Sequence, residues 1–333
     1  MNDPVLDRFL DRSGLATVGA PRTWTPLAGG VSSDIWRVDL ADGTQLCVKR
    51  ALAKLKVAAD WYAPVSRNAY EWAWMRFASG VVPAAVPTPL AQDTEAGLFA
   101  MSWLDPADYP VWKQQLLNGE VNVGTAREVG RVLATVHAAS AGRADLHAAF
   151  DTTSAFHALR LEPYLVHTAS RHPAVATQLH TLVDRTAAHR GALVHGDVSP
   201  KNILVGPRGP VLLDAECAWY GDPAFDLAFC LNHLLLKAVV RPDRTAELHA
   251  AFEALADTYF AVAGFEPRQS LEARAAALLP ALLLARVDGK SPVEYITQEV
   301  ARERVRAAAL PLIVAPPNRL AGVAAQVYRT LGC

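Results

Sequence analysis

The sequence predicts an α+β protein of two lobes, in which a small antiparallel β-sheet lobe is followed by a larger, mostly helical lobe. The chain has 333 residues and 51% of them are hydrophobic, which suits two packed bodies of unequal size. Residues 24–101 contain short alternating segments typical of strands, whereas the sequence after Asp105 has long helical periods rich in Ala, Leu and Arg. We therefore expect residues 1–104 to form the β-rich lobe and residues 105–333 the helical lobe.

The first lobe is predicted to contain two hairpins and a helix. Asp42-Gly43 separates two alternating segments, which is a strong hairpin signal. A helix is expected over residues 66–79, where aromatic residues recur at helical spacing. A second hairpin is expected over residues 89–103, with its turn near residues 95–97. These elements make a small antiparallel sheet with one or two helices.

In the second lobe only residues 193–213 are predicted to form strands. The stretch LVHGDVSPKNILV places His, Asp, Lys and Asn between aliphatic runs. The stretch NILVGPRGPVLLDAE predicts a hairpin whose turn lies at residues 206–210. Folded in this way, the chain brings Asp197, Asn202 and Asp214 to one end of the hairpin.

The charge and cysteine content exclude several classes of protein. Lys and Arg number 32 and Asp and Glu 33, so the formal net charge of -1 gives no general attraction to nucleic acid or to an anionic membrane. The four cysteines lack zinc-site spacing and suit a reducing compartment. The amino terminus lacks an apolar secretory segment, and the most apolar run, residues 275–285, is too short to span a bilayer. We expect a cytoplasmic protein without nucleic-acid or membrane partners.

Asn202 and Asp214 are candidate magnesium ligands. Carboxylate and amide oxygens suit Mg²⁺, which keeps nucleotide phosphate oxygens among its other ligands. Asp197 then remains to accept a proton from a substrate hydroxyl, which is the division of roles in a kinase catalytic loop. The alternative is a set of turn-forming Asx residues, and the upstream elements described next argue against it.

The first lobe supplies candidates for holding a nucleotide. A glycine-rich turn between two strands lets backbone N–H groups approach phosphate oxygens. The candidate residues of this turn are Gly29, Gly30, Ser32 and Ser33. Lys49 ends a strand and is a candidate for the α and β phosphates, with Glu71 on the following helix as its best acidic partner. The segment that joins the lobes offers backbone groups to an adenine edge, and its candidates are Met101, Ser102 and Trp103.

The motifs HGDVSPKN and LLDAECAWYGDPAFDLA resemble the HGDxxxxN, DxE and GDPxxDLA patterns of a known group of enzymes. This group contains aminoglycoside phosphotransferases, choline kinases and methylthioribose kinases and shares the protein-kinase-like fold. The resemblance implies that Asp197 is the catalytic base and that Asn202 and Asp214 are magnesium ligands. It also implies that Lys49 contacts the ATP phosphates and that Glu71 orients Lys49. The last position of DxE is also acidic in methylthioribose kinases, so Glu216 is a candidate to bind metal or substrate.

Two departures from protein kinases restrict the acceptor. Gly196 stands where many protein kinases have an Arg that pairs with a phosphorylated activation loop, so that switch is not available. Only seven residues separate Asp214 from Asp222, which leaves no room for a long activation segment or a peptide-docking platform. We therefore expect a small-molecule hydroxyl substrate rather than a protein.

Other polar residues near these motifs have structural interpretations. Asp222 before Pro223 is typical of a helix N-cap. The family resemblance makes Asp226 a buried anchor for the catalytic loop. His195 and His137 are interpreted as packed residues rather than as acids or bases.

The carboxyl-terminal part of the chain gives the information about the acceptor. Residues 266–333 hold nine Lys or Arg against six Asp or Glu, which argues against a polycationic aminoglycoside. Arg286, Asp288 and Lys290 lie at a predicted helix end, before a helix start predicted at Ser291-Pro292. They are candidates to hold a polar or anionic part of the substrate, and a solvated turn is the alternative.

The sequence-based hypothesis is a kinase that moves the γ-phosphate of ATP, with Mg²⁺, to a hydroxyl of a small metabolite. The metabolite is expected to be neutral or anionic, and sugar-like or aromatic. Lys201 either neutralises the transferring phosphate or is solvated, and Trp219 either stacks on the substrate or belongs to the core. The alternatives are an aminoglycoside kinase and, from another class, a nucleotide-binding regulatory pseudokinase. The sequence does not distinguish ATP from GTP or indicate an oligomeric state.

Overall fold

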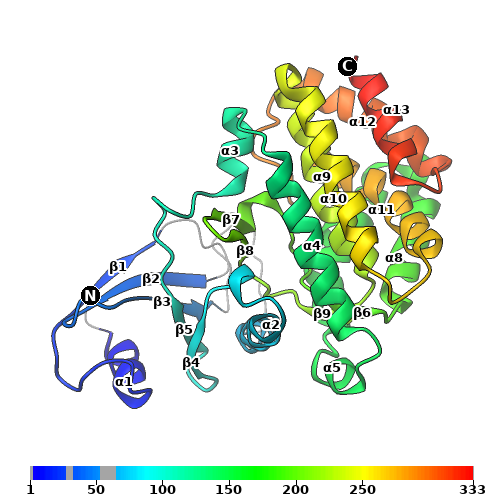
Figure 1. Cartoon of the computed structure of the whole chain (residues 1–333). Helices are drawn as coiled ribbons and strands as arrows, with labels where there is room; N and C mark the ends of the chain where they lie inside the picture. Colours follow the sequence, from blue (N-terminus) through cyan, green and yellow to red (C-terminus); the bar gives the residue numbers. More distant parts are fainter. Residues whose placement is uncertain (1–2, 28–32, 53–64, 333) are drawn as a thin grey trace.

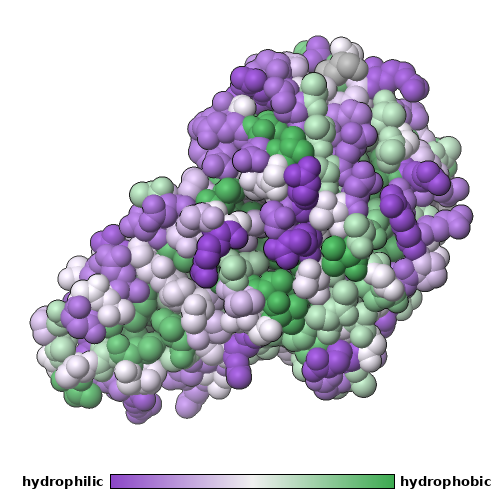
Figure 2. Space-filling view, viewed as in Figure 1, coloured by the Kyte–Doolittle hydropathy of each residue, from purple (hydrophilic) through white to green (hydrophobic). Residues whose placement is uncertain are grey.

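The chain forms two lobes, a small one built around a β-sheet and a larger helical one (Figure 1). The computed structural model describes residues 3–27, 33–52 and 65–332. A space-filling view shows the smaller lobe as the narrower end of an elongated molecule (Figure 2). The predicted α+β fold is confirmed.

The smaller lobe contains a five-stranded antiparallel sheet with the strand order β1-β2-β3-β5-β4. Its elements are α1 (Pro4–Arg12), β1 (Arg22–Pro26), β2 (Ser33–Leu40), β3 (Gln45–Ala51), α2 (Arg67–Val81), η1 (Pro83–Ala85), β4 (Pro89–Asp93) and β5 (Leu98–Ser102). Asp42-Gly43 lies in the turn between β2 and β3, and residues 95–97 lie in the turn between β4 and β5. Both predicted hairpins and the predicted helix at α2 are therefore confirmed.

Alternation along the strands sends side chains to two faces of this sheet. One face carries Val48 and Leu98, which pack against Phe9 of α1. The other face carries Lys49, which lies opposite Phe99 in the register of β3 and β5. Phe99 belongs to the hydrophobic core that continues into the helical lobe. The strand pattern therefore places Lys49 on the face directed toward the larger lobe.

The larger lobe is built around helix α9, against which α4, α10 and α11 pack. Its helices are α3 (Trp112–Asn118), α4 (Val123–Ser140), α5 (Ala144–Ala149), α6 (Thr153–Phe156), the π-helix η2 (His157–Val166), α7 (His167–Arg171), η3 (Pro173–Val175), α8 (Ala176–Ala188), η4 (Pro200–Asn202), α9 (Pro223–Val240), η5 (Pro242–Arg244), α10 (Thr245–Val262), α11 (Arg268–Asp288), α12 (Glu299–Val314) and α13 (Leu320–Leu331). Helix α9 is long and apolar enough to cross a membrane, but 89% of it is buried inside the protein, as expected of a core helix.

Two short strand pairs hold the polar loop of this lobe. Their strands are β6 (Ala192–Val194), β7 (Ile203–Gly206), β8 (Gly209–Leu212) and β9 (Trp219–Gly221). The predicted hairpin is confirmed as β7 paired with β8. The prediction that strands end at residue 213 is wrong, because β6 pairs with β9 through Val194 and Trp219. With three residues, β9 is too short to show the alternation by which a strand is recognised.

The helix start predicted at Ser291-Pro292 is also wrong, because α12 begins at Glu299. The Arg286 guanidinium donates to the Ser291 carbonyl. The Val293 N–H donates to the Arg286 carbonyl at 2.9 Å. These bonds hold the chain after α11 as an irregular segment against the helix end.

Helices α4 and α10 approach closely at Gly130, where an added Cβ would lie 2.3 Å from the Leu255 carbonyl oxygen. We expect Gly130→Ala to destabilise the protein by about 1–3 kcal/mol, because one helix must shift. Gly80→Ala is the matched control, since its Cβ meets nothing within 4 Å, and it should stabilise slightly. Thermal unfolding measures both variants. Equal stability of the two would contradict this packing.

Candidate active site

Asp226, in the first turn of α9, holds the loop between β6 and β7 in place. The Asp226 carboxylate accepts hydrogen bonds from the N–H groups of His195 at 2.7 Å and Gly196 at 2.8 Å. His137 approaches the same carboxylate at 3.3 Å. Asp226 is fully buried, so these bonds form away from water and fix the loop strongly. The contacts agree with the structural interpretation of Asp226 and His137.

His195 occupies the loop as a packed residue. Its Nε2 lies 3.1 Å from the Leu213 carbonyl oxygen, and its Nδ1 accepts from the Asp197 N–H at 3.2 Å. Its ring packs edge-on against Trp74 at 4.7 Å between centroids. Burial lowers the pKa of His195, so the imidazole is neutral at physiological pH.

Gly196 has a conformation that a side chain would not permit. Its φ is +79°, and an added Cβ would lie 2.5 Å from the Cys217 carbonyl oxygen. The absence of an Arg at this position therefore also has a steric reason. The glycine lets the loop pass close to the segment that follows β8.

Asp197, the predicted base, lies in this loop with only 3% of its surface exposed. Its Oδ2 accepts from Asn202 Nδ2 at 2.8 Å and lies 3.2 Å from Lys201 Nζ. The Arg160 guanidinium approaches the same oxygen at 3.1 Å. Burial alone would raise the pKa of Asp197, but Arg160 and Lys201 outweigh it and lower the pKa. The carboxylate is therefore ionised at neutral pH.

Arg160 was not identified from the sequence. It lies on the π-helix η2, is 8% exposed and also donates to the Gly196 carbonyl at 2.5 Å. Single π-turns occur often at functional sites, and Pro163 inside this helix removes a backbone donor. The local signal available in the sequence was an Arg between two leucines in a helical period, which does not identify its distant partner.

Lys49 joins the two lobes. Its ammonium lies 2.8 Å from the Glu71 carboxylate of α2 and 2.5 Å from Asp214 Oδ1, just after β8. Burial opposes the charge of Lys49, but Asp214 and Glu71 outweigh it and raise the pKa. The predicted Lys49–Glu71 partnership is thus present as a buried ion pair.

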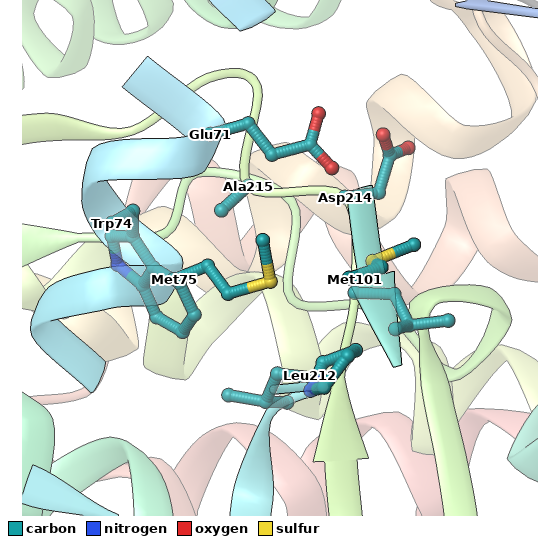
Figure 3. Close-up of a pocket in the computed structure, with 9 residues that line it drawn as sticks. Glu71, Trp74, Met75, Met101, Leu212, Asp214 and Ala215 are labelled. Atoms are coloured by element: carbon teal, nitrogen blue, oxygen red, sulfur yellow. The ribbon is translucent and has the colours of Figure 1, made fainter. Parts of the chain in front are cut away.

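Asp214 is held in an unusual backbone conformation. It has a φ of +68° and is the single non-glycine residue with positive φ among those the structure describes. Such conformations are costly and occur preferentially at functional sites. Asp214 lies beside Glu71, as Figure 3 shows, and its Oδ1 accepts from the Lys49 ammonium.

Met101, one of the three residues predicted to face adenine, lines a small hollow that is open to solvent. The space in it is about 270 Å³, and its lining comes from α2, β5, β8 and the chain after β8 (Figure 3). The lining residues include Trp74, Met75, Met101, Leu212 and Ala215. The apolar lining suits the faces of a flat heterocycle. The hollow opens beside Glu71 and Asp214, at the end where Lys49 lies.

The remaining nucleotide candidates are placed as follows. Ser102 exchanges two hydrogen bonds of 2.9 Å with the backbone of Thr88, and Trp103 lies beneath the Arg37 guanidinium at 5.8 Å. Neither lines the hollow. Ser33 is buried at the start of β2. The predicted phosphate-binding residues Gly29, Gly30 and Ser32 lie outside the described residues.

Glu216, the further candidate for metal or substrate, is paired with an arginine in this arrangement. Its Oε2 lies 3.0 Å from Arg67 Nε at the start of α2. Arg67 also donates to the Leu52 carbonyl at 2.6 Å. The pair ties the segment after β8 to α2 and borders a second hollow of about 320 Å³, which Phe156 and Leu159 also line.

Of the acceptor candidates, only Lys201 contacts the predicted base. Trp219 is fully buried, stacked on Phe156 with centroids 4.3 Å apart, so it belongs to the core. The Asp288 carboxylate is held by two bonds of 2.8 Å from Arg306 and by His172 at 2.8 Å. Asp288 therefore has a structural environment, and the prediction that it faces substrate is not supported.

The other two members of that loop also have partners. Lys290 pairs with Glu162 at 2.7 Å near the surface. Arg286 is buried and donates to the Tyr164 hydroxyl at 3.0 Å. The 286–290 segment is thus held by its surroundings, and both Arg286 and Asp288 are buried.

The fold and this arrangement define a protein with the kinase-like architecture, in which a buried Lys–Glu pair faces a loop bearing Asp and Asn. Comparison with known proteins names the family. The chain matches the Phosphotransferase enzyme family over residues 23–265 and belongs to it.

Individual relatives are distant. The chain is 24% identical to the methylthioribose kinase of Escherichia coli over 67% of its length and 60% of the relative's. It is 26% identical to the methylthioribose kinase of Pectobacterium atrosepticum, over 64% of this chain and 59% of the relative. The chain thus spans about 60% of the length of these relatives.

Solved structures show the same fold. A choline/ethanolamine kinase family protein from Mesorhizobium loti superposes with a TM-score of 0.52 at 17% identity, covering 98% of this chain and 99% of the other. An aminoglycoside phosphotransferase from Alicyclobacillus acidocaldarius gives 0.51 at 18%, covering 94% of each chain. At such identities the likeness concerns the fold alone.

Arg160→Met should raise the pKa of Asp197, because burial then acts against one cation fewer. A base with a raised pKa is protonated at higher pH, so the acid limb of the kcat/KM profile should move upward. Turnover at neutral pH should fall about 10- to 100-fold, because Asp197 loses a group that holds it in position and keeps it ionised. Arg160→Lys keeps the positive charge and should restore part of the turnover. Arg127→Met, at an exposed position of α4, is the control. An acid limb identical to that of the wild type would show that Arg160 does not set the state of Asp197.

Proposed function

We propose that this protein transfers the γ-phosphate of ATP to a hydroxyl of a small neutral or anionic metabolite, sugar-like or aromatic. The observation that supports this most directly is the buried Lys49, bonded to Glu71 and Asp214. In kinases such a pair aligns the phosphates of the nucleotide. The hollow bordered by Met101 gives the adenine a place on the same side of the cleft.

The residues at the site fit magnesium. Asp214 offers carboxylate oxygens, and Asn202 uses its Nδ2 on Asp197, which leaves its amide oxygen for a cation. In the part of the chain that the structure describes, no three or more His, Cys, Asp or Glu side chains gather as a metal site. Nucleotide phosphates and water therefore have to complete the coordination, as they commonly do for Mg²⁺. When bound, the ion neutralises charge that develops on the phosphates.

Asp197 is proposed as the group that receives the hydroxyl proton. Its lowered pKa makes it a weak base, which suits a phosphoryl transfer with a loose transition state, where the proton leaves late. Asn202 and Arg160 hold its carboxylate in position. Lys201, with half of its side chain exposed and its ammonium beside Asp197, is placed to offset charge on the transferring phosphate.

The two alternative functions are less well supported. An aminoglycoside is polycationic, and the groups next to Asp197 are Arg160 and Lys201, which would repel it. A regulatory module without turnover does not need an ionised base beside an Asn amide, whereas this chain retains both. We also propose lobes at residues 1–104 and 105–333, with Mg²⁺-ATP bound between them.

A cytoplasmic location is proposed on the state of the cysteines. Among the described residues, Cys47, Cys217 and Cys230 are free and buried. Reduced, packed cysteines of this kind are usual in a reducing compartment.

Asp197→Asn should lower turnover by at least about 100-fold, the order contributed by a positioned base, and leave Mg²⁺-ATP binding nearly unchanged. Asp214→Asn should weaken Mg²⁺-ATP binding itself. Asp184→Asn, on the exposed face of α8, is the control. ATP consumption over a panel of sugars, amino alcohols, phenolics and aminoglycosides, with nucleotide affinity measured separately, provides the test. ATP binding without turnover on any acceptor would favour the regulatory alternative.

A further inference from the structure

Lys237, on the carboxyl-terminal half of α9, is a fully buried lysine. Its ammonium has no hydrogen-bond partner in the described part of the chain. It lies over the ring of Tyr295, 3.6 Å from the centroid. A cation–π contact of this kind is stabilising, but it does not replace the hydrogen bonds that a buried ammonium loses, so the lysine remains costly to the fold.

Three neighbouring side chains also keep polar atoms unsatisfied. His233 Nε2, Arg286 Nε and the Tyr295 hydroxyl are buried without a hydrogen-bond partner among the described residues. His233 precedes Lys237 by one helical turn, so both lie on one face of α9. Arg286 lies on α11, which packs against α9, and its guanidinium lies over the ring of Tyr164. The Tyr164 ring packs on Phe229, which in turn packs on His233. Buried polar groups are nearly always paired, with protein or with ordered water. These four atoms have no protein partner among the described residues, so their partner has to come from outside these residues.

The missing partner has a definite charge. The ionisable groups acting on His233 are Arg286, Lys237, Lys201 and Lys113, all cationic. The acid that acts on Lys237 is Glu294, and its carboxylate is paired with Lys113 at 2.7 Å. These surroundings lower the pKa of His233 well below that of a free imidazole and that of Lys237 to about 7, so a negative group is what would hold the Lys237 ammonium in its charged form. We call Lys113, Lys201, His233, Lys237 and Arg286 the basic cluster.

The basic cluster adjoins the predicted base. Helix α3, which carries Lys113, packs against both α9 and η4 of the catalytic loop. Lys201, at the other end of the cluster, lies 3.2 Å from Asp197 Oδ2. The cluster thus runs from Asp197 into the helical lobe, whereas Lys49 and the hollow at Met101 lie toward the sheet. A molecule with its acidic group in the cluster would present a nearby hydroxyl to Asp197.

We propose that the basic cluster binds a carboxylate or phosphate group of the acceptor, so that the substrate is an anionic hydroxyl compound. This inference rests on the proposed function and narrows its substrate class. Lys237 is the central residue, with His233 and Arg286 as further donors. Tyr295 closes the site on the side of the irregular segment before α12.

Burial lowers the pKa of Lys237 to about 7. Lys113 and Arg286 lower this pKa further, and Glu294 acts in the opposite direction. An anion beside the ammonium favours its charged form, so binding above pH 7 should take up a proton. In the unfolded chain this lysine keeps its proton to a higher pH. At any pH below 7, Lys237→Met should therefore raise the Tm by a few degrees. This gain in Tm should shrink as the pH rises from 7 toward the pKa of a free lysine.

The first experiment compares acceptors that differ in charge. ATP consumption is measured with D-glycerate against glycerol and with ribose 5-phosphate against ribose, at saturating Mg²⁺-ATP. The acidic member of at least one pair should be preferred about 10- to 100-fold in kcat/KM, as for a charge-assisted hydrogen bond. Lys237→Met should reduce this preference, whereas Arg304→Met, which removes an exposed charge on α12, should not. Equal use of the neutral and acidic members would overturn the inference and leave the proposed kinase intact.

A second experiment does not depend on turnover. Malonate and inorganic phosphate are titrated calorimetrically into the protein saturated with Mg²⁺-ADP, in buffers of different ionisation enthalpy. Wild type and Arg304→Met should bind one of these anions with proton uptake, and Lys237→Met should bind neither. The anion that binds distinguishes a carboxylate from a phosphate site. If the wild type binds neither anion, or if Lys237→Met binds as well as the wild type, the basic cluster is not an anion site. The kinase proposal fails separately if no acceptor of either charge leads to ATP consumption.

Discussion

The arrangement of the two lobes depends on one cation, the ammonium of Lys49, held between carboxylates from different parts of the chain. Glu71 reaches it from α2 in the smaller lobe, and Asp214 from the end of β8 in the larger. Two carboxylates at this distance would repel one another without the ammonium between them. The ion pair therefore aligns α2, the sheet and the β7–β8 hairpin with one another. The hollow beside Met101 lies where these three elements meet.

A second buried carboxylate performs the same task within the larger lobe. Asp226 gathers two backbone N–H groups of the catalytic loop and the His137 ring. The His137 ring in turn meets the Tyr259 hydroxyl at 2.9 Å, so α4, α9, α10 and the loop share one network. Networks of this kind are stable only when each member is satisfied. This explains why the loop can hold Asp197 rigidly although it contains little regular structure.

The sequence predicted the lobes, both hairpins of the sheet and the β7–β8 hairpin, because turn residues and alternation are local signals. It also predicted that Asp197 and Asn202 would meet, which they do at 2.8 Å. Asp214 follows Leu213, whose N–H donates to the Asn202 carbonyl at 2.9 Å, because the hairpin limits where these residues can lie. It did not predict Arg160, which reaches Asp197 from a segment 37 positions earlier, nor that β9 would complete β6. These depend on contacts between distant segments, which no local period records. For Trp219 the sequence left a core position and a substrate contact open, and it did not predict the partner Arg306 of Asp288, because Phe156 and Arg306 are remote in sequence.

The charges around Asp197 have a further consequence for the choice of acceptor. Arg160 and Lys201 keep Asp197 ionised, which makes its carboxylate a weak base. Under the proposed function, the rate then has to come mainly from placing the hydroxyl and the phosphate in line. Placing requires a firm hold on the part of the acceptor that does not react. A buried Lys237 without a hydrogen-bond partner among the described residues weakens the free protein, but its charge is already desolvated before the ligand arrives. The interaction with an anionic group is then stronger than at an exposed lysine, and the stability lost in the fold becomes binding energy that orients the substrate.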